Sequence, residues 1–288
     1  MQYFILLARG QPKLPNLGGK MKNKISSIFI ILLLLHATTH AALKRAIVIG
    51  ATSGMGRAVA KLLAKDGYIL GLASRRLHLL QSLQEEIATE SYIKQIDVTD
   101  HEKTIESLQE LIGEMGGLDL ILISISSYSE LKNKKLAFSS EKKTIDVDLI
   151  GFWVVAKTAL DFFENQGFGH LAGISSMSGL RGTAYNPAYS GAKAFVSRYL
   201  EGVRNKMLQN NIPIYVTDIV PSWVDVEHTT FSQLPGTYWV TPLDKAAKQI
   251  FDAIKAKKKV AYISKRQIII AALLKIVPDF IFNWMGEF

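Results

Sequence analysis

Proton transfer to or from an oxygen atom is the chemistry that three side chains of this sequence could support together: Ser176, Tyr189 and Lys193. Tyr189 and Lys193 lie four positions apart in a segment that we expect to be helical, so they share one face of that helix. Such pairs are frequent on helices and carry little weight alone. Ser176 adds weight because it follows a predicted strand, and ligands bind where the strands of a parallel sheet end.

A glycine cluster, Gly50-x-x-x-Gly54-x-Gly56, follows the first apolar strand and opens an apolar helix. Glycines there allow a tight turn and let backbone N–H groups approach a pyrophosphate at the helix N-terminus. The spacing differs from the commoner GxGxxG, and the position between a strand and a helix is what favours a dinucleotide site. The residues expected to line this loop are Gly50, Thr52, Ser53, Gly54, Met55 and Gly56.

The second strand ends in Ser74, Arg75 and Arg76. An acidic residue near this point usually holds the ribose of NAD(H), whereas planar guanidinium groups suit the additional phosphate of NADP(H). We therefore predict NADP(H); the alternative is a solvated pair of surface arginines. Asp97 ends the third strand and could accept a hydrogen bond from adenine, or act as the N-cap of the next helix.

Strands and helices alternate between residues 43 and 265, which predicts a single α/β domain with a doubly wound, mostly parallel, Rossmann-like sheet. The expected strands are Ala46–Ile49, Tyr68–Ala73, Tyr92–Ile96, Leu118–Ile123, His170–Ser175, Pro213–Val220 and Val260–Ser264. The expected helices are Gly56–Lys65, Leu77–Ala88, Glu102–Met115, Lys143–Asn165, Ala188–Gln209 and Leu243–Lys257.

In combination and order, the glycine cluster, Asp97, Ser176, Tyr189 and Lys193 resemble the classical short-chain dehydrogenase/reductase family over residues 44–265. The resemblance implies an NADP(H)-dependent oxidoreductase that interconverts a carbonyl and an alcohol by hydride transfer. It also implies further cofactor contacts. These would come from Val98, Ser124, Pro221 and Val224, besides Tyr189 and Lys193.

In the mechanism that the resemblance implies, Tyr189 gives the substrate oxygen its proton or takes it away. A free phenol has a pKa of about 10, and Lys193 beside it would stabilise the phenolate. Lys193 would also hold the nicotinamide ribose, while Ser176 would hydrogen-bond the substrate oxygen. Asp148 stands where the family has its fourth catalytic residue, an asparagine.

Four departures from the family pattern favour a second hypothesis, a catalytically weak or inactive NADP(H)-binding sensor or scaffold at a membrane. They are Ile123-Ser124-Ile125-Ser126 in place of Asn-Asn-Ala-Gly, Asp148 in place of asparagine, Ser222 in place of the glycine of Pro-Gly, and Val226 in place of threonine. A carboxylate at Asp148 would add negative charge near Lys193. Ser126 and Ser222 would bring side chains to places where the family keeps its backbone bare against the cofactor.

The net charge of +9 is concentrated at the two ends of the chain. Seven Lys and Arg residues and no acidic ones lie in residues 1–45, and seven lie in residues 253–288 against two acidic ones, which leaves net −3 for the body. Both basic ends are also apolar. This pattern favours a membrane surface as partner and argues against nucleic acid.

Residues 1–42 are expected to lie outside the fold as a leader. Lys22 and Lys24 precede an apolar run, Ile25–Leu35, that is followed by small residues, as in a signal peptide that would begin at Met21. The alternatives are a short membrane anchor and a mis-called start with no targeting role. The tail, residues 266–288, is apolar and basic and could lie in a membrane interface or pack on the domain, and Pro278 should interrupt it. We favour membrane association with the catalytic domain in an NADPH-containing compartment over export after signal cleavage.

Partners and substrate follow from the rest of the sequence. The absence of cysteine excludes thiolate chemistry and disulfides, and no metal site is expected. The aromatic segment Trp223–Trp239 is predicted to form a lid over an apolar carbonyl or alcohol substrate, although core packing would explain it as well. The resemblance implies a homodimer or homotetramer that pairs through Lys143–Asn165 and Ala188–Gln209.

Overall fold

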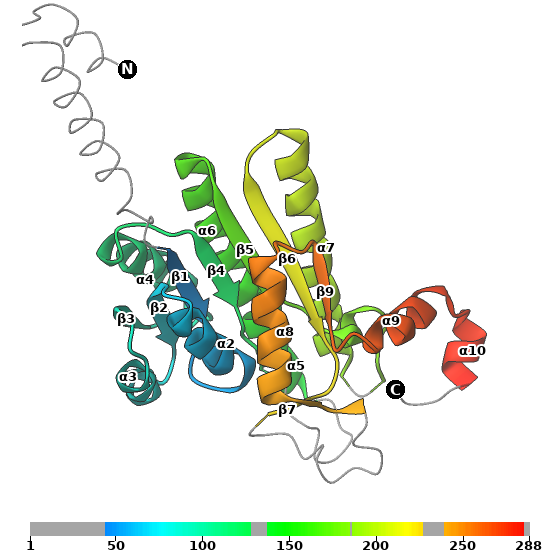
Figure 1. Cartoon of the computed structure of the whole chain (residues 1–288). Helices are drawn as coiled ribbons and strands as arrows, with labels where there is room; N and C mark the ends of the chain where they lie inside the picture. The colour runs from blue at the N-terminus through cyan, green and yellow to red at the C-terminus, as the bar shows by residue number, and fades with distance from the viewer. Residues whose placement is uncertain (1–43, 128–136, 185, 227–238, 285–288) are drawn as a thin grey trace, which may run out of the picture. The chain divides into compact units, whose positions relative to one another are not determined.

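Short apolar segments form seven strands of one sheet in the computed structural model, which describes residues 44–127, 137–184, 186–226 and 239–284. The strands are β1 (Arg45–Ile49), β2 (Ile69–Ser74), β3 (Ser91–Gln95), β4 (Leu120–Ile123), β5 (Gly169–Ile174), β6 (Ile214–Pro221) and β9 (Val260–Ile263). They pair in parallel in the order β3-β2-β1-β4-β5-β6-β9 (Figure 1). The predicted Rossmann-like sheet is confirmed.

Helices cover both faces of this sheet, because each strand buries alternate side chains on opposite sides. In β1, Ile47 and Ile49 belong to the core under α4, α6 and α7, whereas Ala46 and Val48 belong to the core under α2, α3 and α8. The helices are α2 (Gly54–Lys65), α3 (Leu77–Glu86), α4 (His101–Glu114), α6 (Phe152–Gln166), α7 (Pro187–Gln209) and α8 (Leu243–Lys255).

The strand order reverses at β1, which lies between β2 and β4. Ile49 of β1 pairs with Ala73 on one side and with Ile123 on the other. The loops that start at Gly50, Arg75 and Ser124 therefore open at one edge of the sheet. In folds of this type, ligands bind in the crevice at this reversal.

The single helix predicted over Lys143–Asn165 is wrong. The segment consists of α5 (Phe138–Thr144), a π-helical stretch η2 (Ile145–Gly151) and α6. Its apolar spacing does not distinguish a π-helical from an α-helical turn, so the change could not be predicted from the residue pattern. Wide turns of this kind are frequent at functional sites, and Asp148 lies within this one.

One small sheet was not predicted, and two predicted segments lie wholly or mostly outside the described residues. A two-stranded sheet of β7 (Val224–Asp225) and β8 (Thr241–Pro242) was not predicted. The lid predicted over Trp223–Trp239 lies mostly outside the described residues, as does the leader, so both remain predictions.

The tail forms two helices, α9 (Gln267–Ile276) and α10 (Asp279–Trp284), and the interruption expected at Pro278 is confirmed. Within the described residues, none of the helices combines the length and the apolar character needed to cross a membrane.

Candidate active site

The loop after β1 passes so close to the rest of the backbone that two of its positions require glycine. Gly50 has a φ of +86°, and a Cβ on it would lie 2.2 Å from the carbonyl oxygen of Ser124. A Cβ on Gly56 would lie 2.3 Å from the carbonyl oxygen of Gly50. The first turn of α2 contains no acidic residue. No carboxylate there offsets the partial positive charge that the free backbone N–H groups carry at the carboxyl edge of the sheet, where a pyrophosphate could bind.

Arg76 reaches from the end of β2 back to this glycine loop. Its Nη2 donates hydrogen bonds to the hydroxyls of Thr52 and Ser53, both at 3.0 Å. The Oγ1 of Thr52 also lies 2.8 Å from the Oγ of Ser74. Arg76 is thus an exposed arginine that is hydrogen-bonded to the glycine loop, and the phosphate contact predicted for it and Arg75 stays a prediction. A guanidinium and three hydroxyls meet here, and all four can donate to a phosphate.

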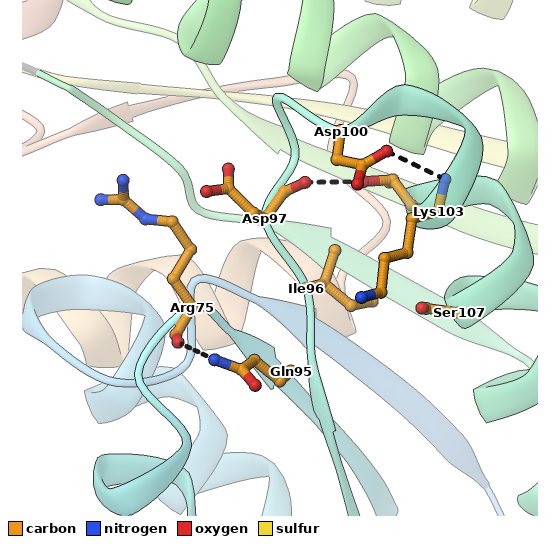
Figure 2. Close-up of a pocket in the computed structure, with 8 residues that line it drawn as sticks. Arg75, Gln95, Ile96, Asp97, Asp100, Lys103 and Ser107 are labelled. Carbon is orange, nitrogen blue, oxygen red and sulfur yellow. Dashed lines mark hydrogen bonds between the residues drawn. The ribbon is translucent and has the colours of Figure 1, made fainter.

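A pocket of about 280 Å³ opens where β2 and β3 end (Figure 2). Its lining residues are Arg75, Gln95, Ile96, Asp97, Asp100, Lys103, Thr104 and Ser107. The pocket thus joins the predicted Arg75 and Asp97 with Lys103, a cation on α4 that the sequence analysis missed. The pocket does not extend to the proton-transfer residues.

Asp97 shapes the loop that borders this pocket, and it is not the N-cap of the following helix. Its Oδ1 accepts hydrogen bonds from the backbone nitrogen and the hydroxyl of Thr99, at 3.1 and 2.8 Å. The N-cap of α4 is Asp100, whose side chain accepts from the backbone nitrogen of Lys103. The alternative role considered for Asp97 is therefore wrong, and the side chain is left exposed beside the pocket.

Lys193 lies buried on α7 between the ends of two neighbouring strands. Its Nζ donates to the carbonyl oxygens of Ile125, after β4, and Ile174, in β5, at 3.2 and 3.3 Å. It also lies 3.4 Å from Oδ2 of Asp148. The same carboxylate accepts hydrogen bonds from the Oγ of Ser126 (3.1 Å) and the backbone nitrogen of Ser127 (2.6 Å). The ammonium is thus fixed in place from three elements.

Ser176 and Tyr189 lie around this fixed ammonium. The Nζ of Lys193 is 5.6 Å from the ring centroid of Tyr189. Ser176 lies two residues after the end of β5 and caps the short helix η3 (Met177–Gly179) by accepting from the nitrogen of Ser178 at 3.1 Å. That helix packs tightly on α7, since a Cβ on Gly179 would lie 2.7 Å from the carbonyl carbon of Lys193. The structure therefore brings all three residues to the end of β5.

Comparisons with known sequences show which family this chain belongs to. The sequence profile of the short chain dehydrogenase family matches residues 44–234. The chain belongs to the short-chain dehydrogenase family. A protein of Myxococcus xanthus described as an uncharacterized oxidoreductase is 33% identical over 195 residues, which cover 67% of this chain and 76% of that protein. A protein of Staphylococcus aureus with the same description is 33% identical over 187 residues, covering 65% and 80% of the two chains.

Solved structures of dehydrogenases share the fold. An acetoin dehydrogenase from Salmonella typhimurium superposes with a TM-score of 0.67 at 18% identity, covering 77% of this chain and 94% of that one. An alcohol dehydrogenase from the archaeon Thermococcus sibiricus, complexed with 5-hydroxy-NADP, gives 0.65 at 23% identity, covering 77% and 95%. This member of the short-chain dehydrogenase family is thus an oxidoreductase of a family that uses NAD(P)(H).

A nicotinamide dinucleotide fits the edge of the sheet that these loops form. Gly50 and Gly56 leave the backbone bare beside α2, and the pocket beyond β2 and β3 offers Arg75 and Asp97. Of the other predicted contacts, Val98 and Val224 are buried in the apolar cores, and Pro221 ends β6. Met55 also packs against a core, so its side chain points inward and only its backbone faces the loop.

Asp218, a buried acid that the sequence analysis missed, connects two elements that carry residues of the site. Asp218 in β6 accepts hydrogen bonds from the hydroxyls of Ser175 (2.6 Å) and Ser197 (2.5 Å). Burial raises the pKa of Asp218, and the bonds from the two serines oppose that rise. Ser175 precedes Ser176, and Ser197 lies one turn after Lys193, so Asp218 links the strand to the helix. A lone acid in the apolar strand Ile214–Pro221 was the available signal.

Proposed function

We propose that this short-chain dehydrogenase interconverts a carbonyl and an alcohol with NADP(H), with Tyr189 as the proton donor or acceptor. The observation that carries the proposal is the buried Lys193, held by the carbonyl oxygens of Ile125 and Ile174 one helical turn from Tyr189. An ammonium is expensive to bury. Its confinement beside a half-buried phenol favours a role in chemistry at that phenol over a role in packing.

Four residues of this chain would have separate roles in proton transfer. When bound, the nicotinamide would supply or accept the hydride. Tyr189 would give its hydroxyl proton to the substrate oxygen, or take the proton in the oxidising direction. Lys193 would stabilise negative charge on the phenol oxygen, while Ser176 would donate a hydrogen bond to the substrate oxygen as its charge grows. Asp148 would hold Lys193 in position.

The proposed preference for NADP(H) rests on two arginines at the end of β2. Arg76 already donates to hydroxyls of the glycine loop, and Arg75 lines the neighbouring pocket. We expect Arg75→Ala to weaken NADPH binding about ten- to a hundred-fold and NADH binding much less, since a lost charge-assisted hydrogen bond costs about 1.5–3 kcal/mol. Arg198→Ala, which removes an exposed arginine on α7, serves as the control. Tighter binding of NADH than NADPH by the unaltered protein would contradict the assignment.

The competing proposal is a weak or inactive NADP(H)-binding sensor or scaffold at a membrane. It is favoured by the carboxylate of Asp148, which partly neutralises the positive charge of Lys193.

We also propose that α6 and α7 pair two or four copies of the chain, a role supported by the exposed Trp153 on α6. Membrane association in an NADPH-containing compartment is likewise proposed, and subcellular fractionation would test it.

A reductase assay with apolar aldehydes and ketones tests the main proposal. We expect NADPH oxidation by the unaltered protein and a loss of at least about a hundred-fold in turnover for Tyr189→Phe, because general acid–base catalysis contributes on that scale. NADPH binding, followed by fluorescence, should persist in the variant. Tyr199→Phe, on the same helix, should keep its activity. Equal turnover of the unaltered and the Tyr189→Phe proteins would refute the proposal.

A further inference from the structure

Helix α9 carries apolar side chains on both its inner and its outer face, although only the inner face is packed. Its inner face contacts the domain through Ala271, Ile270 and Leu274, which lie against Met177 and Val220. Its outer face carries four large apolar side chains to the surface. They are Ile268, Ile269, Leu273 and Ile276, which are 49%, 69%, 56% and 76% exposed. A helix that is apolar all round is normally buried on all sides.

Helix α10 follows α9 along the chain, and Arg181 contacts its start and its side. Arg181, which follows η3, donates through Nη2 to the carbonyl of Val277 (3.1 Å) and to the carboxylate of Asp279 (2.8 Å). Its guanidinium also lies 4.7 Å from the ring centroid of Phe282. In this position Phe280 is 73% exposed and Ile281 is 36% exposed. The six exposed side chains of α9 and α10 are here called the C-terminal apolar face, and Figure 1 shows both helices beyond the edge strand β9.

The charges around the C-terminal apolar face are cationic. Lys265 and Lys275 are exposed at its border, and within the described residues neither makes an ion pair. Asp279 is the only acidic residue of α9 and α10, and its charge is offset by Arg181. A second copy related by a two-fold axis would bring like charges together across this face. Anionic lipid headgroups would instead meet the lysines while the acyl region receives the isoleucines and Phe280.

We propose that the C-terminal apolar face docks on the surface of an anionic lipid bilayer. The helices contain 10 and 6 residues. They would lie in the interface, with the apolar side chains inserted roughly 5–10 Å. Trp239 lies near the start of α9, 5.9 Å from the guanidinium of Arg266, where a tryptophan can sit at headgroup level.

Docking would place the proton-transfer residues next to the lipid. Met177 and Val220, which support the inner face of α9, directly adjoin Ser176 and Pro221. On the proposed function, a carbonyl or alcohol dissolved in the bilayer would have a short path to the site. This consequence depends on the enzyme proposal, whereas docking itself does not, so lipid binding and turnover are measured separately.

Site-specific fluorescence on the full-length protein tests the docking. The chain has no cysteine, so Ile276→Cys can be labelled at one position with an environment-sensitive fluorophore, and Leu208→Cys on α7 gives a matched exposed control. With vesicles of phosphatidylcholine and phosphatidylglycerol, we expect a blue-shifted emission and quenching by a lipid-borne quencher at position 276 only. The unaltered protein should bind vesicles of phosphatidylcholine alone about ten-fold more weakly than the anionic vesicles. The double variant Lys265→Gln with Lys275→Gln should bind the anionic vesicles about ten-fold more weakly than the unaltered protein does. Lys157→Gln with Lys248→Gln, which removes two lysines elsewhere, should leave binding unchanged.

Three outcomes would overturn the proposal. One is an unchanged emission at position 276 although the protein co-sediments with anionic vesicles, since the leader and not the C-terminal apolar face would then bind the lipid. Another is a blue shift without lipid that grows with protein concentration, which would assign the face to a second copy. The third is equal quenching at positions 276 and 208.

Discussion

The ammonium of Lys193 lies 3.4 Å from the carboxylate of Asp148, and the two side chains are only 2% and 0% exposed. The same carboxylate accepts from the hydroxyl of Ser126. Ser126 and Asp148 belong to two of the four departures from the family pattern, and their contact places both in one hydrogen-bonded group. A buried carboxylate needs donors on its free lone pairs, which Ser126 and the nitrogen of Ser127 provide.

We expect Asp148→Ala to destabilise the protein by about 3 kcal/mol or more, because it leaves the ammonium of Lys193 buried without its counter-charge. Asp148→Asn should lose less, since an amide oxygen can still accept from Ser126 or Ser127. Urea denaturation of the two variants measures the difference. A smaller loss for alanine than for asparagine would contradict this account of the pair.

The same asparagine variant separates the two functional proposals. If the site is active as it stands, Asp148→Asn should change turnover by no more than a few-fold. A gain of about ten-fold or more, which corresponds to roughly 1.4 kcal/mol in the barrier, would instead indicate a site that the carboxylate restrains. Ser126→Ala serves as a companion, because it removes one donor to the carboxylate without changing the charge.

Substitution of Gly56 by alanine should disturb the cofactor loop. The added Cβ would lie 2.3 Å from the carbonyl oxygen of Gly50, so the backbone must move. We expect a loss of about 1–3 kcal/mol in stability, typical of overpacking, and at least a ten-fold weaker binding of NADPH. Gly202→Ala on α7 meets nothing within 4 Å and should stabilise the protein by up to about 1 kcal/mol. Equal NADPH affinity of both variants would contradict the role of the tight loop.

Asp218 should act as a positioning residue through Ser175 and Ser197. We expect Asp218→Ala to lower kcat by about ten-fold or more while KM and NADPH binding change little, because the strand and helix that carry the reacting groups lose their link. Asp218→Asn can still accept from one serine and should recover part of the rate. If both variants lose only stability and keep kcat, Asp218 has a purely structural role.

Much of the fold could be predicted because its signals are local. The apolar strands, the helices between them and the glycine loop each depend on residues within about a dozen positions. Contacts between distant elements could not be predicted in this way. Asp148 and Ser126 are 22 positions apart, and Asp218 in β6 meets Ser175, which follows the neighbouring strand β5 and lies 43 positions earlier. The π-helical turn was missed because its apolar spacing resembles that of an α-helix.

The arginines at the end of β2 illustrate the same limit. Their type and position predicted a phosphate site, but not that Arg76 would bond to Thr52 and Ser53, 24 and 23 positions earlier. Lys103 was missed because it enters the pocket from the start of α4, where the sequence shows only an ordinary solvated lysine.

His170 should make the stability of the protein depend on pH. It is buried in β5, where its Nε2 lies 2.8 Å from the hydroxyl of Thr217. Burial, together with the charge of Lys257, lowers the pKa of His170 from 6.5 to about 4. Between these values the unfolded chain binds a proton that the folded chain excludes. The stability from this residue is therefore complete above pH 6.5 and is lost as the pH falls toward 4.

The loss should reach about 3 kcal/mol at pH 4, since each pKa unit corresponds to about 1.4 kcal/mol. Urea denaturation at a series of pH values would measure it, and His170→Gln, which cannot be protonated but can still bond to Thr217, should flatten the dependence over that range. His78→Gln, an exposed histidine on α3, should leave the curve unchanged and corrects for any general effect of removing a histidine. If the His170→Gln curve falls as steeply as that of the unaltered protein, carboxylates account for the acid sensitivity and His170 does not.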